Sequence, residues 1–159
     1  MNDEPLVMVP FDKLRFLVID DDRTLLELID AMLRVAGVGS VIKAASALAA
    51  LNVMADQRKK FDCIICDQGM PNMTGVELLR AIRAGQYSHV PADIRFIMVT
   101  ASSQESVVKA AVSLDVTGYI MKPVSKDSLV KAIHRAFNRN ISLKKPEDYT
   151  AVHLPLEPV

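Results

Sequence analysis

The sequence predicts an α/β fold, a doubly wound parallel sheet of five strands with helices on both faces. Five short apolar runs alternate along the chain with five longer segments in which apolar residues recur at helical spacing. Several of the short runs are apolar almost without interruption, which is typical of parallel strands buried on both faces. A regular alternation of strand and helix predicts parallel strands joined by right-handed crossovers.

The predicted strands are short and are each followed by a helix. Strands are expected at residues 16–19, 38–43, 61–66, 94–99 and 117–121. Helices are expected at residues 24–35, 47–54, 75–83, 103–114 and 129–137. In the first helix, the spacing places Leu25, Leu28, Ile29 and Met32 on one apolar face.

Capping residues mark several of the predicted helix ends. Side chains that can accept a hydrogen bond from the first turn stand before each helix: Asp22, Ser46, Thr74, Ser102 (with Glu105 as a capping box) and Ser125. Gly37 suits the end of the first helix, because glycine adopts the left-handed conformation that terminates helices.

Composition restricts the class of protein. The chain has 159 residues and is 50% hydrophobic, enough for one domain with a substantial core. Lys plus Arg (19) balance Asp plus Glu (19), which argues against a broad electrostatic surface for nucleic acid or membrane. No apolar run approaches the roughly 20 residues that span a bilayer. The N-terminus lacks the pattern of a signal peptide, so a cytoplasmic location is expected.

Cys63 and Cys66 are the only cysteines, and their CxxC spacing raises the alternatives of a redox motif or a metal site. Both lie in the apolar run FDCIICD, which reads as a buried strand. Residues three apart on a strand face opposite sides of the sheet, so burial in the core is the preferred interpretation.

Polar residues follow the predicted strands at one edge of the sheet. In parallel α/β sheets, ligands bind at the carboxyl ends of the strands. The residues expected there are Asp20, Asp21 and Asp22 after the first strand, Asp67 after the third, Thr100 and Ala101 after the fourth, and Lys122 and Pro123 after the fifth.

This set of side chains has a chemical logic. Clustered carboxylates repel one another, and a divalent cation with oxygen ligands relieves the repulsion. Mg²⁺, or Mn²⁺, is the expected cofactor, because such ions combine a few carboxylates with water and phosphate oxygens. Lys122 supplies a positive charge to a phosphoryl group and Thr100 a hydrogen bond. A carboxylate in this pocket can attack phosphorus and form an aspartyl phosphate.

Four segments in order along the chain, FLVIDDD, CIICDQGMPNMTG, FIMVTAS and GYIMKP, closely resemble the CheY-like receiver domain of two-component response regulators. The resemblance covers residues 14–138. It implies a flavodoxin-like (βα)5 fold with strand order 2-1-3-4-5. Residues 1–13 are then an N-terminal extension, and residues 139–159 a C-terminal tail that carries no effector domain.

The resemblance also assigns roles to the acidic residues. Asp67 is expected to be the phosphoacceptor and also a metal ligand, with Asp21 binding the metal directly and Asp20 acting through the metal's water shell. The backbone carbonyl of Gly69 is expected to be the remaining protein ligand. Because Gly69 has no side chain, it can neither shield nor orient the water that hydrolyses the phosphoryl group, which leaves the lifetime of that group open.

Lys122 is expected to pair with the carboxylate and phosphoryl oxygens, and Thr100 and Tyr119 to form the family's switch pair. The surface remodelled by phosphorylation is expected to comprise the fourth helix, the fifth strand and the fifth helix. The resemblance implies a phosphorylation switch with slow self-dephosphorylation rather than a turnover enzyme.

The implied partners are a sensor histidine kinase or a histidine phosphotransfer protein as donor, and a downstream protein as target. Direct binding to nucleic acid and insertion into a membrane are not expected. A phosphorylation-dependent homodimer stays open. So do two further alternatives, a phosphorelay intermediate and a receiver that is part of a longer chain.

A second family also fits the opening motif. DDDRTL matches the first motif of haloacid-dehalogenase-type phosphatases, with Asp20 as nucleophile and Asp22 as acid/base. That family needs a further strand ending in paired acids after Lys122, and the sequence offers only a helix and a proline-containing tail. The segment CDQGMPNMTG also has no role in such a phosphatase, so the receiver interpretation is preferred.

The tail after residue 138 contains apolar residues at Tyr149, Val152, Leu154 and Leu156. Two interpretations stay open at this stage: the tail docks on a partner or packs on the domain itself, or it is a disordered remnant.

Overall fold

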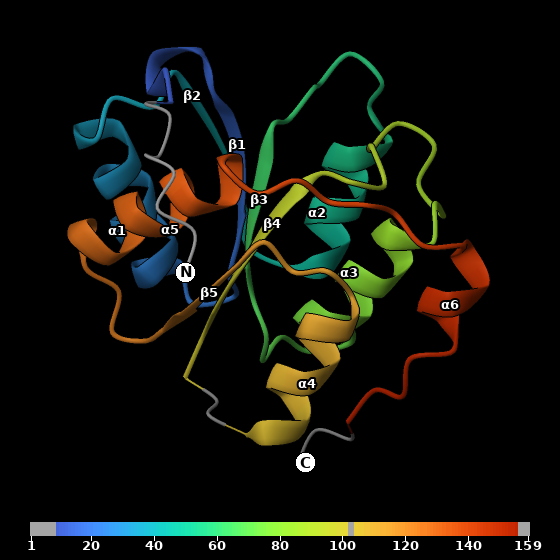
Figure 1. Ribbon diagram of the computed structural model, residues 1–159. Helices are drawn as coiled ribbons and strands as arrows, with labels where there is room; N and C mark the ends of the chain where they lie inside the picture. The colour runs from blue at the N-terminus through green and yellow to red at the C-terminus, as the bar shows by residue number, and fades with distance from the viewer. Residues whose placement is uncertain (1–8, 102–103, 156–159) are drawn as a thin grey trace.

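The computed structural model describes residues 9–101 and 104–155. Its centre is a sheet of five parallel strands in the order β2-β1-β3-β4-β5, as the resemblance to receiver domains implied (Figure 1). The strands are β1 Arg15–Ile19, β2 Ser40–Ala44, β3 Cys63–Asp67, β4 Arg95–Thr100 and β5 Gly118–Met121. Each predicted strand is present, with bounds shifted by one or two residues.

A helix follows every strand. The helices are α1 Arg23–Val35, α2 Ala47–Ala55, α3 Gly75–Arg83, α4 Glu105–Ser113 and α5 Lys126–Phe137. The start of α5 was predicted three residues too late, because its first turn is polar and carries no apolar periodicity. Two short helices stand outside the alternation, the 3-10 helix η1 Phe11–Lys13 and the helix α6 Pro146–Thr150.

Helices cover both faces of the sheet and divide the interior into two cores. On one face, α1 and α5 pack on residues that include Phe16, Val18 and Cys63. On the other, α2, α3 and α4 pack on residues that include Leu17, Ile19 and Cys66. Figure 1 shows the two layers of helices on either side of the strands. Every residue of β3 is buried, as expected for the central strand of such a sheet.

The predicted apolar face of α1 was wrong by about one residue. The buried residues of α1 are Leu26, Ile29, Asp30 and Leu33, whereas Leu28 is 46% exposed. The helix has apolar residues on more than half of its circumference, so periodicity alone left the rotation about the helix axis undecided. Packing against the sheet selects the orientation that buries both Leu26 and Leu33.

The predicted caps are confirmed wherever they fall on described residues. The side chains of Asp22, Ser46, Thr74 and Ser125 each accept a hydrogen bond from the backbone of the following turn. Gly37 has a φ of 97°, and hydrogen bonds from Gly37 and Val38 close the end of α1. The predicted cap Ser102 lies outside the described residues.

The two cysteines are fully buried, one in each core, as the spacing predicted. Burial raises the pKa of both thiols, so neither is a reactive thiolate near neutral pH. Among the helices of residues 9–101 and 104–155, none is long and apolar enough to cross a bilayer.

A buried arginine in α3 forms hydrogen bonds to two other segments of the chain. Arg83 is 2% exposed and donates hydrogen bonds to the carbonyls of Ala92 and Ile94, before β4, and of Leu114 and Asp115, after α4. The distances lie between 2.7 and 3.1 Å. Arg83 therefore supplies the hydrogen bonds that these carbonyls lack within secondary structure.

The C-terminal tail packs on the domain in the part that the structure describes. Helix α6 lies beside α3 (Figure 1), and Tyr149 is fully buried there. Val152 and Leu154 are half-buried against the same core. Leu156 lies outside the described residues, as do residues 1–8 of the predicted N-terminal extension.

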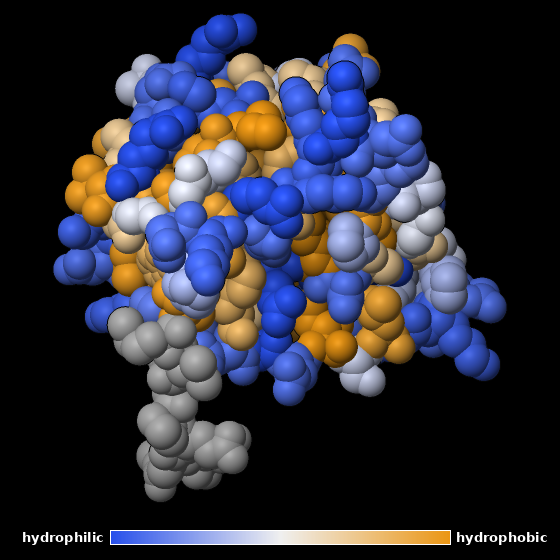
Figure 2. Space-filling view, turned by 90° about the horizontal axis from the view of Figure 1, so that it is seen from above, coloured by the Kyte–Doolittle hydropathy of each residue, from blue (hydrophilic) through white to orange (hydrophobic). Residues whose placement is uncertain are grey.

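The surface opposite the predicted site is mixed in character. Figure 2 looks onto the edge where the strands begin, and hydrophilic residues there alternate with separate hydrophobic areas. Over the described residues, the large exposed apolar side chains lie in α1, α2, α4, β5 and the segment before α6: Leu28, Val35, Leu48, Val112, Met121 and Leu143.

Candidate functional site

The acidic residues predicted to meet at the carboxyl edge of the sheet do meet there. Asp20 and Asp21 directly follow β1, and Asp67 stands on the neighbouring strand β3. Carboxylate oxygens of these three residues lie within 4.8 Å of one another. Asp67 and Thr100 are the last residues of their strands rather than the residues after them. Asp67 is held by the pairing of β3 with β4, and Thr100 by the pairing of β4 with β5.

The three carboxylates differ in burial. Asp20 is 1% exposed and Asp67 is 6% exposed, whereas Asp21 is exposed. When all three are ionised, they carry three negative charges in a small volume with little solvent around two of them. Such a cluster is unfavourable without a cation.

Lys122 supplies part of that positive charge. Its Nζ lies 3.1 Å from Oδ1 of Asp67 and 3.5 Å from Oδ2 of Asp20. The backbone N–H of Lys122 donates to the carbonyl of Thr100, which fixes the residue at the end of β4. Burial by itself would lower the pKa of Lys122, but the two carboxylates outweigh burial and raise it, so the ammonium stays charged.

Asp20 is the most constrained of the acids. Its Oδ1 accepts a hydrogen bond of 2.8 Å from the backbone N–H of Asp22. Its Oδ2 is buried and has no hydrogen-bond partner among the described residues. Burial raises the pKa of Asp20, the charge of Asp67 adds to the rise, and the contacts with Asp22 and Lys122 only partly offset it. This buried oxygen has the Lys122 ammonium 3.5 Å away but no hydrogen bond among the described residues, so it can bind a ligand from outside the chain.

Asp22 faces away from this cluster. Its Oδ1 accepts hydrogen bonds from the backbone N–H groups of Thr24 and Leu25, at 3.0 and 3.2 Å. Asp22 is therefore the N-terminal cap of α1, where a carboxylate also meets the positive end of the helix dipole.

Sequence reasoning missed Gln68, which shapes the loop after Asp67. Gln68 is 1% exposed, and its Oε1 accepts a hydrogen bond of 2.8 Å from the backbone N–H of Val76. Its carbonyl accepts from the N–H groups of Met70 and Gly75. Only a polar side chain next to the acceptor pointed to this role, which is too weak a signal in sequence alone.

Gly75 allows α3 to start close to the acceptor. A Cβ at Gly75 would lie 2.7 Å from the backbone oxygen of Asp67, a distance that real Cβ atoms do not adopt. A Cβ at Gly69, in contrast, would have no neighbour within 4 Å. The loop therefore has no room for a side chain at Gly75 but has room for one at Gly69, the residue predicted to offer its carbonyl to the metal.

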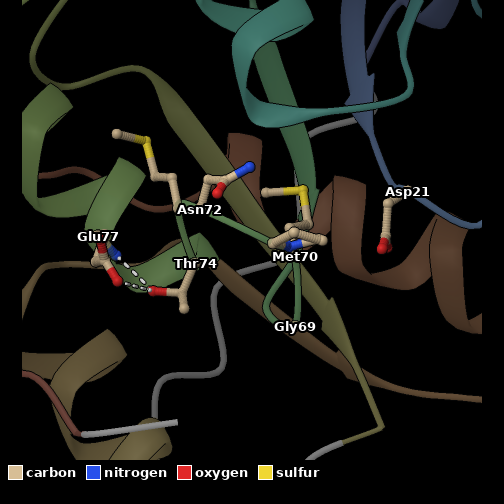
Figure 3. A pocket seen from close by; sticks show the side chains of 8 residues that line it. Asp21, Gly69, Met70, Asn72, Thr74 and Glu77 are labelled. Carbon is tan, nitrogen blue, oxygen red and sulfur yellow. Dashed lines mark hydrogen bonds between the residues drawn. The ribbon is translucent and has the colours of Figure 1, made fainter. Parts of the chain in front are cut away.

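A cavity of about 440 Å³ lies beside Asp21, the exposed member of the acidic cluster. Figure 3 shows Asp21 on one side of it, and the loop with Met70 and Asn72 on the other. Thr74 donates a hydrogen bond to Glu77, which completes the wall at the start of α3. This cavity provides space for a group that approaches Asp21 from solvent.

Thr100 and Tyr119 lie on the same face of the sheet. In the register of β4 with β5, Met98 pairs with Tyr119, and Thr100 stands two residues after Met98. Residues two apart on a strand share a face, here the face that α4 covers. Thr100 is 2% exposed and Tyr119 is half-buried.

These features define a class: a doubly wound parallel α/β protein with an acidic, lysine-containing site at the carboxyl edge of its sheet. The model of the response regulator receiver domain family matches residues 16–134. The chain belongs to this family.

Relatives of known function agree. The chain is 32% identical to the chemotaxis protein CheY of Pseudomonas aeruginosa over 127 residues, which cover 79% of this chain and 98% of CheY. It is 30% identical to the chemotaxis protein CheY-3 of Vibrio cholerae, covering 79% of this chain and 93% of that protein.

Solved structures agree as well. A response regulator receiver domain protein from Clostridium thermocellum matches with a TM-score of 0.68 and 28% identity, covering 79% of this chain and 94% of that one. The chemotaxis protein CheY4 of Vibrio cholerae matches with a TM-score of 0.65 and 29% identity, and the match covers 77% of this chain and 98% of CheY4.

Receiver domains bind Mg²⁺ at a cluster of aspartates, and the residues at this edge fit such an ion. All the side chains offered are carboxylates, which are the hard oxygen ligands that Mg²⁺ prefers. The buried Oδ2 of Asp20 lacks a hydrogen-bond partner among the described residues. Three carboxylates and one ammonium leave two negative charges, which one divalent cation neutralises.

The two aspartates Asp20 and Asp22 are expected to respond differently to substitution. Asp20→Asn removes a charge from the cluster and should weaken Mg²⁺ binding by about tenfold or more. Asp22→Asn is the matched control, because asparagine caps a helix as well as aspartate does, and it should change binding little. Isothermal titration of each variant with Mg²⁺ measures both affinities. Equal losses in the two variants would place Asp22 in the metal site and contradict its assignment as a cap alone.

Proposed function

We propose that this protein is a phosphorylation switch in which Asp67 accepts a phosphoryl group in the presence of Mg²⁺. The observation that carries the proposal is the grouping of Asp67 with Lys122, 3.1 Å apart, beside the two further carboxylates Asp20 and Asp21. A carboxylate held by a lysine and a metal site is placed for nucleophilic attack on phosphorus. Membership of the receiver family supports the same role.

The chemistry assigns a task to each of the chain's own groups. A carboxylate oxygen of Asp67 forms the new bond to phosphorus, and the bond from phosphorus to the donor breaks. The leaving imidazole of a phosphohistidine keeps the electron pair of that bond and takes a proton from solvent. Lys122 offsets negative charge on the phosphoryl oxygens. The metal, bound by Asp21, Asp67 and the Gly69 carbonyl with Asp20 nearby, would neutralise further charge.

The switch is proposed to run from Thr100 to Tyr119. A phosphoryl group on Asp67 adds up to about two negative charges and three acceptor oxygens at the end of β3. The hydroxyl of Thr100 is expected to turn toward it, and the ring of Tyr119 to follow on the same face of the sheet. The surface of α4, β5 and α5 then changes shape, which biases a two-state equilibrium.

The partners follow from this chemistry. A sensor histidine kinase or a histidine phosphotransfer protein is proposed as the donor, with the cavity beside Asp21 as its approach to the acceptor. A downstream protein is proposed as the target of the α4-β5-α5 surface. A homodimer formed on phosphorylation and a relay to another histidine are the alternatives to a single protein target.

The direct test is incubation with acetyl phosphate and Mg²⁺, followed by borohydride reduction and peptide mass spectrometry. The label is expected at Asp67. A label at Asp20 would instead support an aspartate-nucleophile phosphatase. That alternative is disfavoured, because β5 is the last strand among the described residues and only α5 and α6 follow it.

Thr100→Ala should separate labelling from switching. The variant is expected to accept label at Asp67, because the nucleophile and Lys122 remain. The change in amide hydrogen exchange of α4 and β5 on phosphorylation is expected to be lost. Thr100→Ser, which keeps the hydroxyl, is the matched control and should behave as the unaltered protein does. A full exchange response in the alanine variant would remove Thr100 from the switch.

A further inference from the structure

Residues 144–154 form a strap across α3 and the end of α4. Tyr149, in α6, is fully buried against the core on the α4 face of the sheet, and Val152 and Leu154 pack beside it. Arg80 of α3 donates a hydrogen bond to the carbonyl of Val152. The strap lies beyond residues 16–134, so it is no part of the match to the receiver family.

The polar contacts of the strap converge on the connection between α4 and β5. The hydroxyl of Tyr149 donates a 2.7 Å hydrogen bond to Oδ2 of Asp115 and accepts one from the backbone N–H of Lys144. Nζ of Lys144 donates to the carbonyl of Ser113 and lies 3.8 Å from Oδ2 of Asp115. Burial raises the pKa of Tyr149, so its hydroxyl keeps the proton that it donates.

Asp115 is held from two sides. Its side chain bonds to the strap, and its carbonyl accepts a 2.9 Å hydrogen bond from Arg83. Its backbone has a φ of 55°, in the left-handed region where residues other than glycine are rare. Three residues further on, β5 begins, and it carries Tyr119. The strap therefore fixes the segment that connects α4 to the switch strand.

The strap has features of a segment that undocks at a low cost in free energy. Helix α6 has five residues, far fewer than an isolated helix needs in water, so it exists only while it is docked. Tyr149 is its only buried residue, and the neighbouring side chains of α6 are exposed. Elements with one buried anchor and many exposed backbone bonds open at low free energy.

We propose that the strap of residues 144–154 restrains α4 and β5 in the arrangement in which Asp67 is an unmodified carboxylate paired with Lys122. The inference rests on the proposed function, because it makes the strap a regulator of the same switch. Movement of the α4-β5 connection breaks the bonds from Tyr149 and Lys144, so the strap opposes phosphorylation. By linkage, phosphorylation loosens the strap to the same extent.

The test uses the full chain and beryllofluoride with Mg²⁺, a stable mimic of the phosphoryl group. Hydrogen exchange of the backbone of residues 144–154 is expected to speed up when beryllofluoride binds. Tyr149→Phe, which removes only the bonds of the hydroxyl, is expected to lower the beryllofluoride concentration for half-saturation by about fivefold or more, measured by ¹⁹F NMR.

Two variants control for unrelated effects. Tyr87→Phe removes a tyrosine hydroxyl outside the strap, and Lys145→Ala removes an exposed lysine with no side-chain ion pair or hydrogen bond to the described residues. Both should bind beryllofluoride as the unaltered protein does, whereas Lys144→Ala should follow Tyr149→Phe. The inference fails if beryllofluoride binds the Tyr149 and Lys144 variants as tightly as the unaltered protein and leaves the hydrogen exchange of residues 144–154 unchanged. If beryllofluoride does not bind the unaltered protein or any variant, the proposed function is overturned as well.

Discussion

Asp67→Asn is expected to reduce labelling by acetyl phosphate by at least about two orders of magnitude. Asparagine has the shape of aspartate but lacks the nucleophilic oxygen, so the change removes the chemistry and preserves the fold. Asp67 is 6% exposed between β1 and β4, where a larger substitute would disturb packing. Mass spectrometry of the intact protein after timed incubation with Mg²⁺ and acetyl phosphate measures the effect.

The folded state of the Asp67→Asn variant should be at least as stable as the unaltered protein without metal. The change removes one of three clustered negative charges, and Lys122 keeps its ion pair with Asp20, 3.5 Å from Nζ to Oδ2. Calorimetry in the absence of Mg²⁺ checks this point. Asp22→Asn is the control for labelling, because it alters a helix cap and leaves the cluster intact. Undiminished labelling of the Asp67 variant would move the acceptor to another carboxylate.

Arg83→Met is expected to be strongly destabilising although it lies outside the site, at about 3–5 kcal/mol of unfolding free energy. Methionine fills a similar volume but donates no hydrogen bond. Four carbonyls, of Ala92, Ile94, Leu114 and Asp115, would lose their donor, and the bonds to Ile94 and Leu114 are buried. For a chain of this length the melting temperature should fall by roughly 10 °C.

Arg83 is charged near neutral pH, because burial lowers its pKa only to about 10. Arg58→Met is the matched control. The Arg58 side chain is 87% exposed and pairs with Asp56 only at the surface, so its loss should change stability by about 0.5 kcal/mol or less. Urea denaturation followed by circular dichroism measures both variants. A loss of under about 1 kcal/mol in the Arg83 variant would show that water or backbone movement replaces its hydrogen bonds.

The grouping of the acids and the lysine was predictable from the sequence because it depends only on where each strand ends. Each strand ends in residues that must lie at one edge of a parallel sheet, so Asp20, Asp67 and Lys122 could be brought together without knowing the packing. The caps at Asp22 and Thr74 were predictable for the same reason, since a cap bonds to its own helix. The strand order came from the resemblance to receiver domains rather than from the residues themselves.

What the sequence did not predict depends on contacts between distant segments. Leu28 has the same hydropathy as Leu26, and only the fit of α1 to the sheet decides which of them is buried. Arg83 resembles an ordinary cation near the end of a helix, where its charge would favour the dipole in any case. Its burial depends on carbonyls up to 32 residues away. The available signal for the strap was a few apolar residues in a short tail, and it left docking and disorder equally open.

The open space at Gly69 bears on the duration of a signal. A Cβ there meets no atom within 4 Å, whereas the next glycine along the loop, Gly75, tolerates none. Side chains of different size and polarity can therefore occupy position 69 without repacking the fold. If Asp67 carries the phosphoryl group, the access of water to it depends on that position. We then expect the lifetime of the phosphoryl group to be set in part by the residue at position 69, separately from the stability of the protein.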